Sequence, residues 1–372
     1  MRKRSSPDER PSAFRSMASQ VTAQSMPLQL DIFPSIAYQH PRGETWRLML
    51  QGRLTRQAPP SIGKRWLLHQ LLRSLKANQR DIDQQCFQER IGPFLRKGEA
   101  GQRIFLRIGS HTLRLKRRTR GNGLFASKID LPASILQIPG EEAGTWHPSI
   151  TIDCSLEEEA ITARGKIFLI PPRGTSIVTD IDDTIKDTRV TDRKELLAQT
   201  FLRPFEPIDG MASLYRMWSD QGALFHYVSS SPWQLFQPLE AFLEASQFPS
   251  GSMHLRWFQL RDEIFKRWRL LRRKSKGGII AGMIDRMPQR KFVLIGDSGE
   301  RDPEIYAKLA SKYPYQVRHV LIRDLPQRPM EGERLRRVLH RCQPVPVKLF
   351  RHPDEIAKIL YPEDDRSFDR SF

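Results

Sequence analysis

The sequence predicts an α/β fold, a Rossmann-like parallel sheet with helices on both faces and no large cap, preceded by a β-rich, sandwich-like domain. Two observations predict it. After the PPRG segment at 171–174, short apolar runs alternate with helical patterns, as expected for βαβ units. Before that segment, short strand-like runs alternate with Gly, Pro and charged residues, as in antiparallel sheets.

The change of pattern at this segment divides the chain. We expect four parts: a disordered basic tail (1–25), a β-rich domain (26–172), a catalytic domain (173–350) and a polar C-terminal tail (351–372). The first stretch begins basic, like a secretory signal, but the apolar run that should follow is missing.

The expected elements of the N-terminal part are strands and one helix. The strand-like runs are WRLMLQGRL, RIFLRIG, HTLRLK, SITIDCSL and AITARGKIFLI. Leu68, Leu71, Leu72 and Leu75 repeat at the spacing of one helical face, which predicts a helix lying on the sheet. In the C-terminal part the expected strands are 176–179, 223–228, 254–258, 291–295 and 319–322.

Composition limits the class of protein. Of 372 residues 39% are hydrophobic, and no apolar run approaches the roughly 18 residues that span a bilayer, so we expect a cytoplasmic globular protein. Cys86, Cys154 and Cys342 lack CxxC spacing, which favours neither a disulfide framework nor a zinc site. The sequence leaves the oligomeric state open.

The net charge of +19 favours polyanions as partners: nucleic acid, anionic lipid or phosphorylated substrates. Basic residues cluster at 114–120 and 266–276, and no zinc-finger or RNA-recognition pattern lies beside them, so no specific nucleic acid is expected. The stretch 264–271 separates apolar from basic residues on a helix. It suits the surface of an anionic membrane, or a helix packed on the sheet with its basic face in water.

The first strand of the C-terminal part runs into Asp180-Ile181-Asp182-Asp183-Thr184, a D-x-D-x-T. Asp180 is placed to attack phosphorus and to ligate a cation, and Asp182 to donate and accept the proton of the leaving oxygen and of water. The alternative is an acidic turn that caps the next helix.

Two other strands end in residues suited to the same chemistry. Ser229 follows the second strand and is assigned to phosphate, and Ser231, before Pro232, to helix capping. The fourth strand ends in GDSGERD, where Asp297 is the expected direct ligand of Mg²⁺. Asp302 either binds the ion through water, holds the loop or caps the following helix.

A phosphoryl-transfer site also needs a fixed cation to hold the nucleophile and the phosphate oxygens. Lys276 is the candidate, since it opens the helix that leads into the Asp297 strand, and Lys274 is its main rival.

Taken in order, DIDDT, YVSSSP, Lys276 and GDSGERD resemble the four motifs of the haloacid dehalogenase superfamily of phosphotransferases. The longer strings SIVTDIDDTIKDT, HYVSSSPW and KFVLIGDSGERDPEIY resemble more narrowly the actin-patch-associated phosphatidate phosphatase family, and lipins share the D-x-D-x-T logic. The resemblance is strong over 175–324 and only architectural before it.

This resemblance implies roles for individual residues. Asp180 would be the nucleophile, Asp182 the acid/base and Thr184 a support of the loop, while Ser229 and Lys276 hold the phosphate. Mg²⁺ would lie between Asp180, the main-chain carbonyl of Asp182, and Asp297, with Asp302 as outer support.

Three functions follow from these observations. The first is a magnesium-dependent phosphatidate phosphatase, because a site without a large cap admits a lipid or another bulky phosphomonoester at an anionic membrane. The second is a phosphatase of nucleic-acid ends or phosphoproteins. The third is a non-catalytic lipid- or protein-binding module, which the intact Asp180, Asp182 and Asp297 disfavour.

Overall fold

The computed structural model describes residues 27–39, 45–57, 84–136, 149–156, 161–189, 193–256 and 276–360. Four features expected from the sequence lie outside them: the tail at 1–25, the helix around Leu68, the amphipathic stretch 264–271, and Lys274.

The N-terminal part is one mostly antiparallel nine-stranded sheet with the path β1-β3-β2-β9-β8-β5-β6, to which β4 and β7 add beside β3. The strands of this sheet share one apolar core, to which Leu48, Leu106 and Leu169 contribute. The strands are β1 (Leu28–Ile32), β2 (Ser35–Gln39), β3 (Thr45–Arg56), β4 (Lys97–Gly98), β5 (Ile104–Ile108), β6 (His111–Arg114), β7 (Leu124–Pro132), β8 (Ser149–Leu156) and β9 (Thr162–Ile170). The helices are α3 (Gln84–Leu95) and α4 (Ala133–Leu136).

The C-terminal part holds a six-stranded sheet with the order β12-β11-β10-β13-β14-β15, and each pair of neighbouring strands in it is parallel. The strands are β10 (Thr175–Thr179), β11 (Leu224–Pro232), β12 (Gly251–Arg256), β13 (Lys291–Asp297), β14 (Val317–Arg323) and β15 (Val347–Phe350). The helices are α5 (Arg193–Phe201), α6 (Met211–Asp220), α7 (Phe236–Ala245), α8 (Lys276–Arg286), α9 (Asp302–Lys312), α10 (Gly332–Cys342) and the 3₁₀ helices η2 (Trp233–Leu235) and η3 (Pro353–Leu360).

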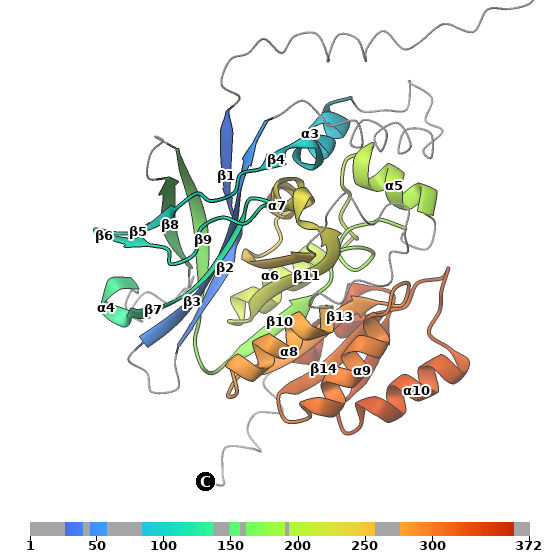
Figure 1. Ribbon diagram of the computed structural model, residues 1–372. Helices are drawn as coiled ribbons and strands as arrows, with labels where there is room; N and C mark the ends of the chain where they lie inside the picture. The colour runs from blue at the N-terminus through green and yellow to red at the C-terminus, as the bar shows by residue number, and fades with distance from the viewer. Residues whose placement is uncertain are drawn as a thin grey trace, which may run out of the picture.

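Helices cover both faces of this parallel sheet (Figure 1). Alternate strand residues point to opposite faces, so Ile177 and Val293 pack with α6, α7 and η3, whereas Val178 and Leu294 pack with α8, α9 and α10. Burial on both faces explains why these strands read as continuous apolar runs. The expected α/β fold with a parallel sheet is confirmed.

Several elements differ in extent from the prediction. β12 begins at Gly251, three residues earlier than expected, at a point where a Cβ would lie 2.3 Å from the carbonyl oxygen of Phe225 on β11. β15 was not predicted, because it is short and only Phe350 in it is buried. The segment between Thr184 and α6 contains the helix α5, which was not among the expected elements.

The C-terminal end of the described chain belongs to this fold. Ile356 of η3 lies in the core on the α6 side of the sheet, and Trp218 donates a hydrogen bond from Nε1 to the carbonyl oxygen of Ala357 (3.2 Å). The packed part therefore reaches Leu360, ten residues beyond the boundary expected at 350.

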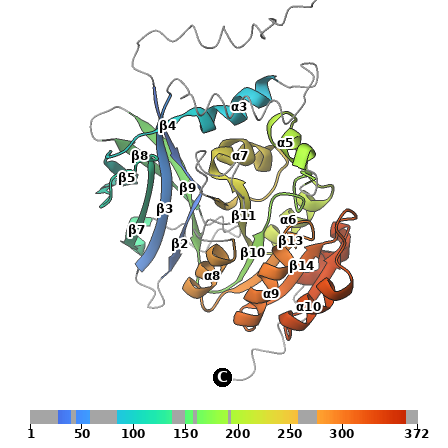
Figure 2. The same cartoon turned by 45° about the vertical axis from the view of Figure 1, so that its right-hand side comes forward.

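The two parts lie against each other, with α3 of the N-terminal part extending over α5 and α7 (Figure 2). Among the described residues, no helix has both the length and the apolar character needed to cross a membrane.

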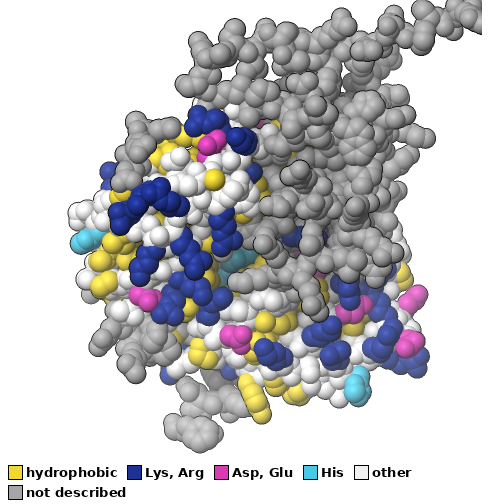
Figure 3. All heavy atoms as spheres, viewed as in Figure 1, with side chains coloured by type: hydrophobic (Ala, Val, Ile, Leu, Met, Phe, Trp, Pro, Cys, Tyr) yellow, Lys and Arg dark blue, Asp and Glu magenta, His cyan; other side chains and the backbone are white. Residues whose placement is uncertain are grey.

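Basic side chains collect over α9 and α10. A groove between these helices is lined by Arg301, Lys308, Arg334, Arg336, Arg337, His340 and Arg341, with Glu304 as its acidic member. Figure 3 shows Lys and Arg side chains gathered at the lower right of the molecule, where these helices lie in Figure 1. Within the described residues, Arg301, Lys308, Arg336 and Arg341 form no ion pair.

Candidate active site

The predicted site residues meet at the carboxyl edge of the parallel sheet, where the strands of a doubly wound fold place their ligands. Asp180 follows β10 and continues its ladder, since its N–H donates to the carbonyl oxygen of Ile295 (2.9 Å). The chain then turns sharply, and three successive N–H groups point to the carbonyl oxygen of Ile181. Asp183 takes a positive φ of 53° in this turn, a conformation that Asp adopts more readily than most side chains.

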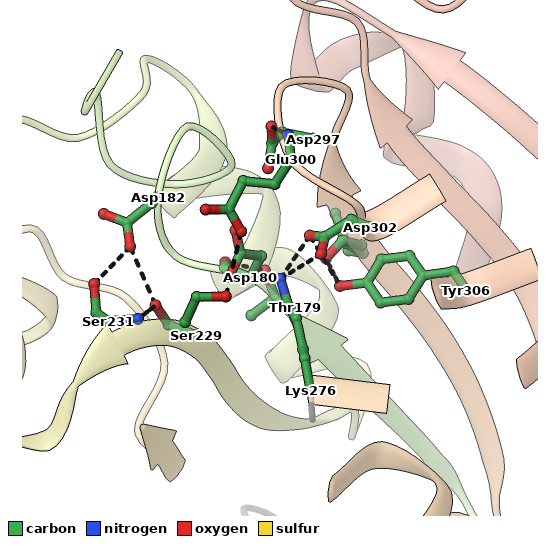
Figure 4. A network of polar contacts seen from close by, with 12 residues as sticks. Thr179, Asp180, Asp182, Ser229, Ser231, Lys276, Asp297, Glu300, Asp302 and Tyr306 are labelled. Atoms are coloured by element: carbon green, nitrogen blue, oxygen red, sulfur yellow. Dashed lines mark hydrogen bonds and ion pairs between the residues drawn. The ribbon is translucent and has the colours of Figure 1, made fainter. Parts of the chain in front are cut away.

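Asp180, Asp297 and Asp302 form a buried carboxylate cluster, and one oxygen of each lies within 4.8 Å of those of the other two. β13 delivers Asp297 and the first turn of α9 delivers Asp302. Lys276, at the start of α8, lies among them: its Nζ is 2.7 Å from Asp180 Oδ1 and 2.6 Å from Asp302 Oδ1 (Figure 4). The lysine predicted from the sequence therefore contacts Asp180, the predicted nucleophile.

Two carboxylate oxygens of this cluster are free to bind a cation. Asp180 Oδ2 and Asp297 Oδ2 are buried and accept no hydrogen bond from any described residue. A buried carboxylate oxygen without a partner is costly, because it has lost water and gained nothing in exchange. Three carboxylates at this spacing are the oxygen donors that Mg²⁺ prefers, so the residues fit the predicted ion.

The backbone around Asp297 is shaped by its neighbours. Asp297 Oδ1 accepts hydrogen bonds from the N–H groups of Gly299 (2.6 Å) and Glu300 (3.0 Å), which leaves Oδ2 for the cluster. Gly296 lies directly under Asp302, and a Cβ there would come within 2.2 Å of Asp302 Oδ2. Glycine is therefore needed at 296 to let Asp302 approach.

Burial controls the electrostatics of the cluster. It raises the pKa of Asp180, Asp297 and Asp302, and the Lys276 ammonium opposes this rise at each of them. Burial by itself would lower the pKa of Lys276, but Asp180 and Asp302 raise it. Lys276 is therefore a permanent cation, and a divalent ion would favour the ionised form of all three carboxylates.

The side-chain partners of Asp182 differ from those of Asp180. Its Oδ1 is 2.8 Å from Lys186 Nζ and accepts from Thr188 Oγ1 (3.0 Å), while Oδ2 accepts from Ser231 Oγ (2.7 Å) and Ser229 Oγ (3.1 Å). Burial by itself would raise the pKa of Asp182, but Lys186 and the hydroxyl groups lower it to about 2. Asp182 is thus held as an anion by four side chains.

The assignment of Ser231 to helix capping is wrong. β11 continues through Pro232, so Ser231 lies in extended backbone and its hydroxyl points to Asp182. η2 begins at Trp233, and no side chain caps its N-terminus. Ser229, expected at the phosphate, lies beside Ser231 and accepts its N–H (2.9 Å), at the same edge of the sheet (Figure 4).

Asp302 is not a helix cap either, since the N-cap position of α9 is Arg301 and Asp302 is paired with Lys276. Thr184 is fully buried within the turn, and its hydroxyl oxygen has no hydrogen-bond partner among the described residues. The turn is tied instead through Thr179, whose hydroxyl lies 2.7 Å from Tyr215 Oη.

Sequence reasoning missed three residues of the site. Lys186 and Thr188 hold Asp182, and the signal for them was their position just past the D-x-D-x-T. Glu300 lies within GDSGERD and was treated as a spacer, yet its side chain points to Asp180 in Figure 4. Burial, opposed by Lys276, raises the pKa of Glu300 to about 7, and Ser230 Oγ donates to its Oε2 (3.3 Å).

The comparison with known proteins agrees with this geometry. A family model described as "Phosphatidate phosphatase APP1, catalytic domain" matches residues 175–324. That segment is therefore similar to the APP1 catalytic domain. They begin with β10 and end just after β14, so the matched segment contains Asp180, Ser229, Lys276 and Asp297.

Two curated relatives match the chain. An uncharacterized protein of Schizosaccharomyces pombe is 33% identical over 183 residues, which is 48% of this chain and 30% of that protein. Phosphatidate phosphatase APP1 of Saccharomyces cerevisiae is 34% identical over 181 residues, 47% of this chain and 30% of that protein. The match thus spans less than a third of the length of either relative.

Among solved structures, a β-glucuronidase of Parabacteroides merdae covers 80% of this chain and 34% of its own, with 11% identity and a TM-score of 0.26. A likeness of this size carries no argument about fold or function.

Proposed function

We propose that this chain is a magnesium-dependent phosphatidate phosphatase with a haloacid dehalogenase-like catalytic domain. The observation that carries the proposal is the buried cluster of Asp180, Asp297 and Asp302 around Lys276 at the carboxyl edge of the sheet. The substrate class rests on the match to the APP1 catalytic domain and on the name of the yeast relative.

In the proposed reaction, a carboxylate oxygen of Asp180 attacks the phosphorus of phosphatidate. The bond from phosphorus to the glycerol oxygen breaks, and Asp182 gives that oxygen a proton, so diacylglycerol leaves and an aspartyl-phosphate remains. Asp182 then takes a proton from water, whose oxygen attacks the phosphorus, so that inorganic phosphate departs and Asp180 is restored.

Other residues of the site position the transferred group. Lys276 and Ser229 hold its oxygens, and Thr184 supports the loop that carries Asp182. Mg²⁺ held by Asp180, the carbonyl of Asp182, and Asp297, with Asp302 in support, would neutralise charge on the phosphate. The cluster also explains why Lys276 must be fixed: it offsets the repulsion between Asp180 and Asp302.

The partner that we propose is the surface of an anionic membrane, which the protein meets peripherally from the cytoplasmic side. The unpaired cations of the α9–α10 groove and the net charge of +19 support it, because both attract acidic head groups.

Phosphate release tests the function directly. Wild-type protein is given phosphatidate in mixed micelles, 5′- or 3′-phosphorylated DNA, or a phosphopeptide, each with Mg²⁺ or a chelator. We expect release from phosphatidate with Mg²⁺ alone, and a loss of roughly 10⁴-fold or more in Asp180→Asn. The matched control is Asp220→Asn, an exposed position at the end of α6, which should keep full activity. Release from DNA or peptide but not from phosphatidate would replace the proposed substrate.

A further inference from the structure

The N-terminal part contacts the catalytic part at several places, and two of them connect through side chains to Asp182. The first is Trp233, two residues after Ser231. The Arg53 guanidinium of β3 lies over the Trp233 ring at 3.8 Å from its centroid, and the Phe33 ring is 5.9 Å away. Phe33 also meets Phe236 edge to face at 5.2 Å. The strand end that carries Ser229 and Ser231 is thus anchored on the N-terminal sheet.

Polar contacts reinforce this first junction. Gln237 of α7 donates from Nε2 to Asp31 Oδ1 on β1 (3.0 Å), and the N–H of Met253 on β12 donates to the carbonyl oxygen of Pro34 (3.2 Å). Arg53 is buried and its Nε donates to the carbonyl oxygen of Asn122 (3.0 Å), so its position over Trp233 is set by the N-terminal part itself.

The second junction is Arg90 of α3. Its Nη1 donates to three carbonyl oxygens after and within the last turn of α5, those of Gln199 (3.1 Å), Thr200 (3.0 Å) and Arg203 (2.5 Å). Its guanidinium carbon lies 3.7 Å from the centroid of the Phe205 ring. One buried arginine of the N-terminal part therefore holds the end of α5 and the residues that follow it.

Those residues carry the contact on to the site. Lys186 Nζ lies 4.7 Å from the centroid of the same Phe205 ring. The backbone beside it is fixed too, because the N–H of Asp187 donates to the carbonyl oxygen of Glu206 (2.9 Å). Lys186 in turn pairs with Asp182. The path from α3 to Asp182 is Arg90, Phe205, Lys186.

The two paths reach opposite oxygens of one carboxylate. The Trp233 path ends at Asp182 Oδ2 through the serines, and the Arg90 path ends at Oδ1 through Lys186. The hydrogen-bond and ion-pair partners of Asp180, Asp297, Asp302 and Lys276 in the described chain, by contrast, all lie in the catalytic part. Ile36 and Phe168 share an apolar core with α8, but the polar and aromatic contacts of the N-terminal part lead to the acid/base and not to the nucleophile.

We propose that the N-terminal part is a positioning element for Asp182, and that Arg90 and Trp233 are positioning residues for proton transfer to the leaving oxygen. This rests on the proposed function, in which Asp182 gives a proton to that oxygen as its bond to phosphorus breaks. Proton donation matters for a glycerol oxygen, which is a poor leaving group as an alkoxide. It matters little for 4-nitrophenolate, which leaves as the stable anion.

Leaving-group dependence tests the proposal with full-length protein. Arg90→Ala, the milder Trp233→Phe and Asp182→Asn are compared on dioctanoyl phosphatidate and on 4-nitrophenyl phosphate. The rate of leaving-group release is measured in a single turnover, because the later attack of water needs Asp182 as a base whatever the leaving group was. We expect this rate on phosphatidate to fall by roughly 10-fold or more in Arg90→Ala, and less in Trp233→Phe, with changes below about 3-fold on 4-nitrophenyl phosphate. The Mg²⁺ concentration for half-maximal rate should not move. Arg107→Ala, which removes an exposed β5–β8 ion pair, should change neither rate.

The outcomes separate the possibilities. Equal losses on both substrates in both junction variants would mean that the junction only supports folding, and would overturn the proposal, as would unchanged rates on both. If Asp182→Asn slows the single-turnover release of both leaving groups equally, Asp182 is not the acid and the proposed function fails with this inference. If Asp182→Asn shows the leaving-group dependence and the junction variants do not, only this inference fails.

Discussion

Asp180 and Asp182 are the same residue type two positions apart, yet their surroundings move their pKa values in opposite directions. Burial beside Asp297 and Asp302 raises the pKa of Asp180, whereas Lys186 and the hydroxyl groups of Ser231 and Thr188 overcome burial at Asp182 and lower its pKa. A phosphate dianion bound beside Asp182 would raise that pKa, since like charge disfavours the ionised form. Substrate entry itself would then prepare Asp182 to act as an acid.

At the same scale, Gly296 decides whether the cluster forms. In Gly296→Ala the added methyl would lie 2.7 Å from Asp302 Cβ, so Asp302 must move away from Lys276. We expect the variant to fold but to lose roughly 100-fold or more in phosphatase rate and to need more Mg²⁺. Rates across a Mg²⁺ titration check this.

The matched control is Gly282→Ala on α8. There the new Cβ meets only the flexible end of Arg286, at 3.2 Å, and alanine is the better helix former. Full activity and unchanged or higher thermal stability are expected. If Gly296→Ala behaved like this control, the close approach of Asp302 would not matter for function.

At the scale of elements, a buried polar chain crosses three strands below the site. Arg290 Nε donates to Ser176 Oγ (2.6 Å), which lies 3.0 Å from His226 Nε2, and His226 Nδ1 lies 2.7 Å from Ser252 Oγ. His254 Nε2 follows at 2.9 Å from Ser252 Oγ. The chain is consistent with a neutral His226 that accepts at Nε2 and donates at Nδ1.

This row of hydrogen-bonded side chains makes the free energy of unfolding depend on pH. Burial lowers the pKa of His254 from 6.5 to about 4, and burial with His254 and Arg290 nearby lowers that of His226. Both histidines stay neutral in the folded state while the unfolded chain binds protons below about pH 6.5. The free energy of unfolding should therefore fall as pH drops from about 6.5 to about 4, by a few kcal/mol at most.

Urea denaturation at several pH values measures the effect, and the comparison with His254→Gln isolates it. Asp180 and Asp297 have raised pKa values and contribute with the opposite sign, but equally in both proteins. A shallower decline in His254→Gln is expected, and an identical decline would contradict the role of this chain.

For the whole molecule, the distribution of charge matters more than its sum. We expect the protein to bind vesicles containing phosphatidylserine better than neutral ones, and to lose this binding as salt rises, because exposed charges are screened. Reversing Arg336 and Arg341 to Glu in the α9–α10 groove should weaken binding several-fold in a sedimentation assay. The matched control reverses Lys116 and Arg117 of the other basic cluster, with the same change in net charge. Equal weakening in both variants would mean that net charge alone attracts the protein.

The linker between the two parts of the molecule is fixed by Arg290 of the catalytic part. Arg290 Nη1 donates to the carbonyl oxygens of Pro171 (3.0 Å) and Arg173, and Nη2 to that of Thr175 (2.8 Å). The expected boundary at 173 therefore coincides with the passage from β9 to β10, but the linker is held by hydrogen bonds. These hydrogen bonds fix the linker, so the two parts are not joined like freely moving domains.

The order of residues along the chain was enough to predict five of the six strands of the parallel sheet and the acidic residues at their ends. Apolar runs and the chemistry that follows them are properties of neighbouring residues, so Asp180, Ser229, Lys276 and Asp297 could be named without coordinates. The partners of Asp182 could not. Ser231 reads as a helix cap until β11 is seen to extend past it, and nothing near Arg90 or Arg53 in the sequence points to a site about a hundred residues away. Contacts between distant segments depend on how the sheets pack, and this packing decides which carboxylate is nucleophile-like and which is held as an anion.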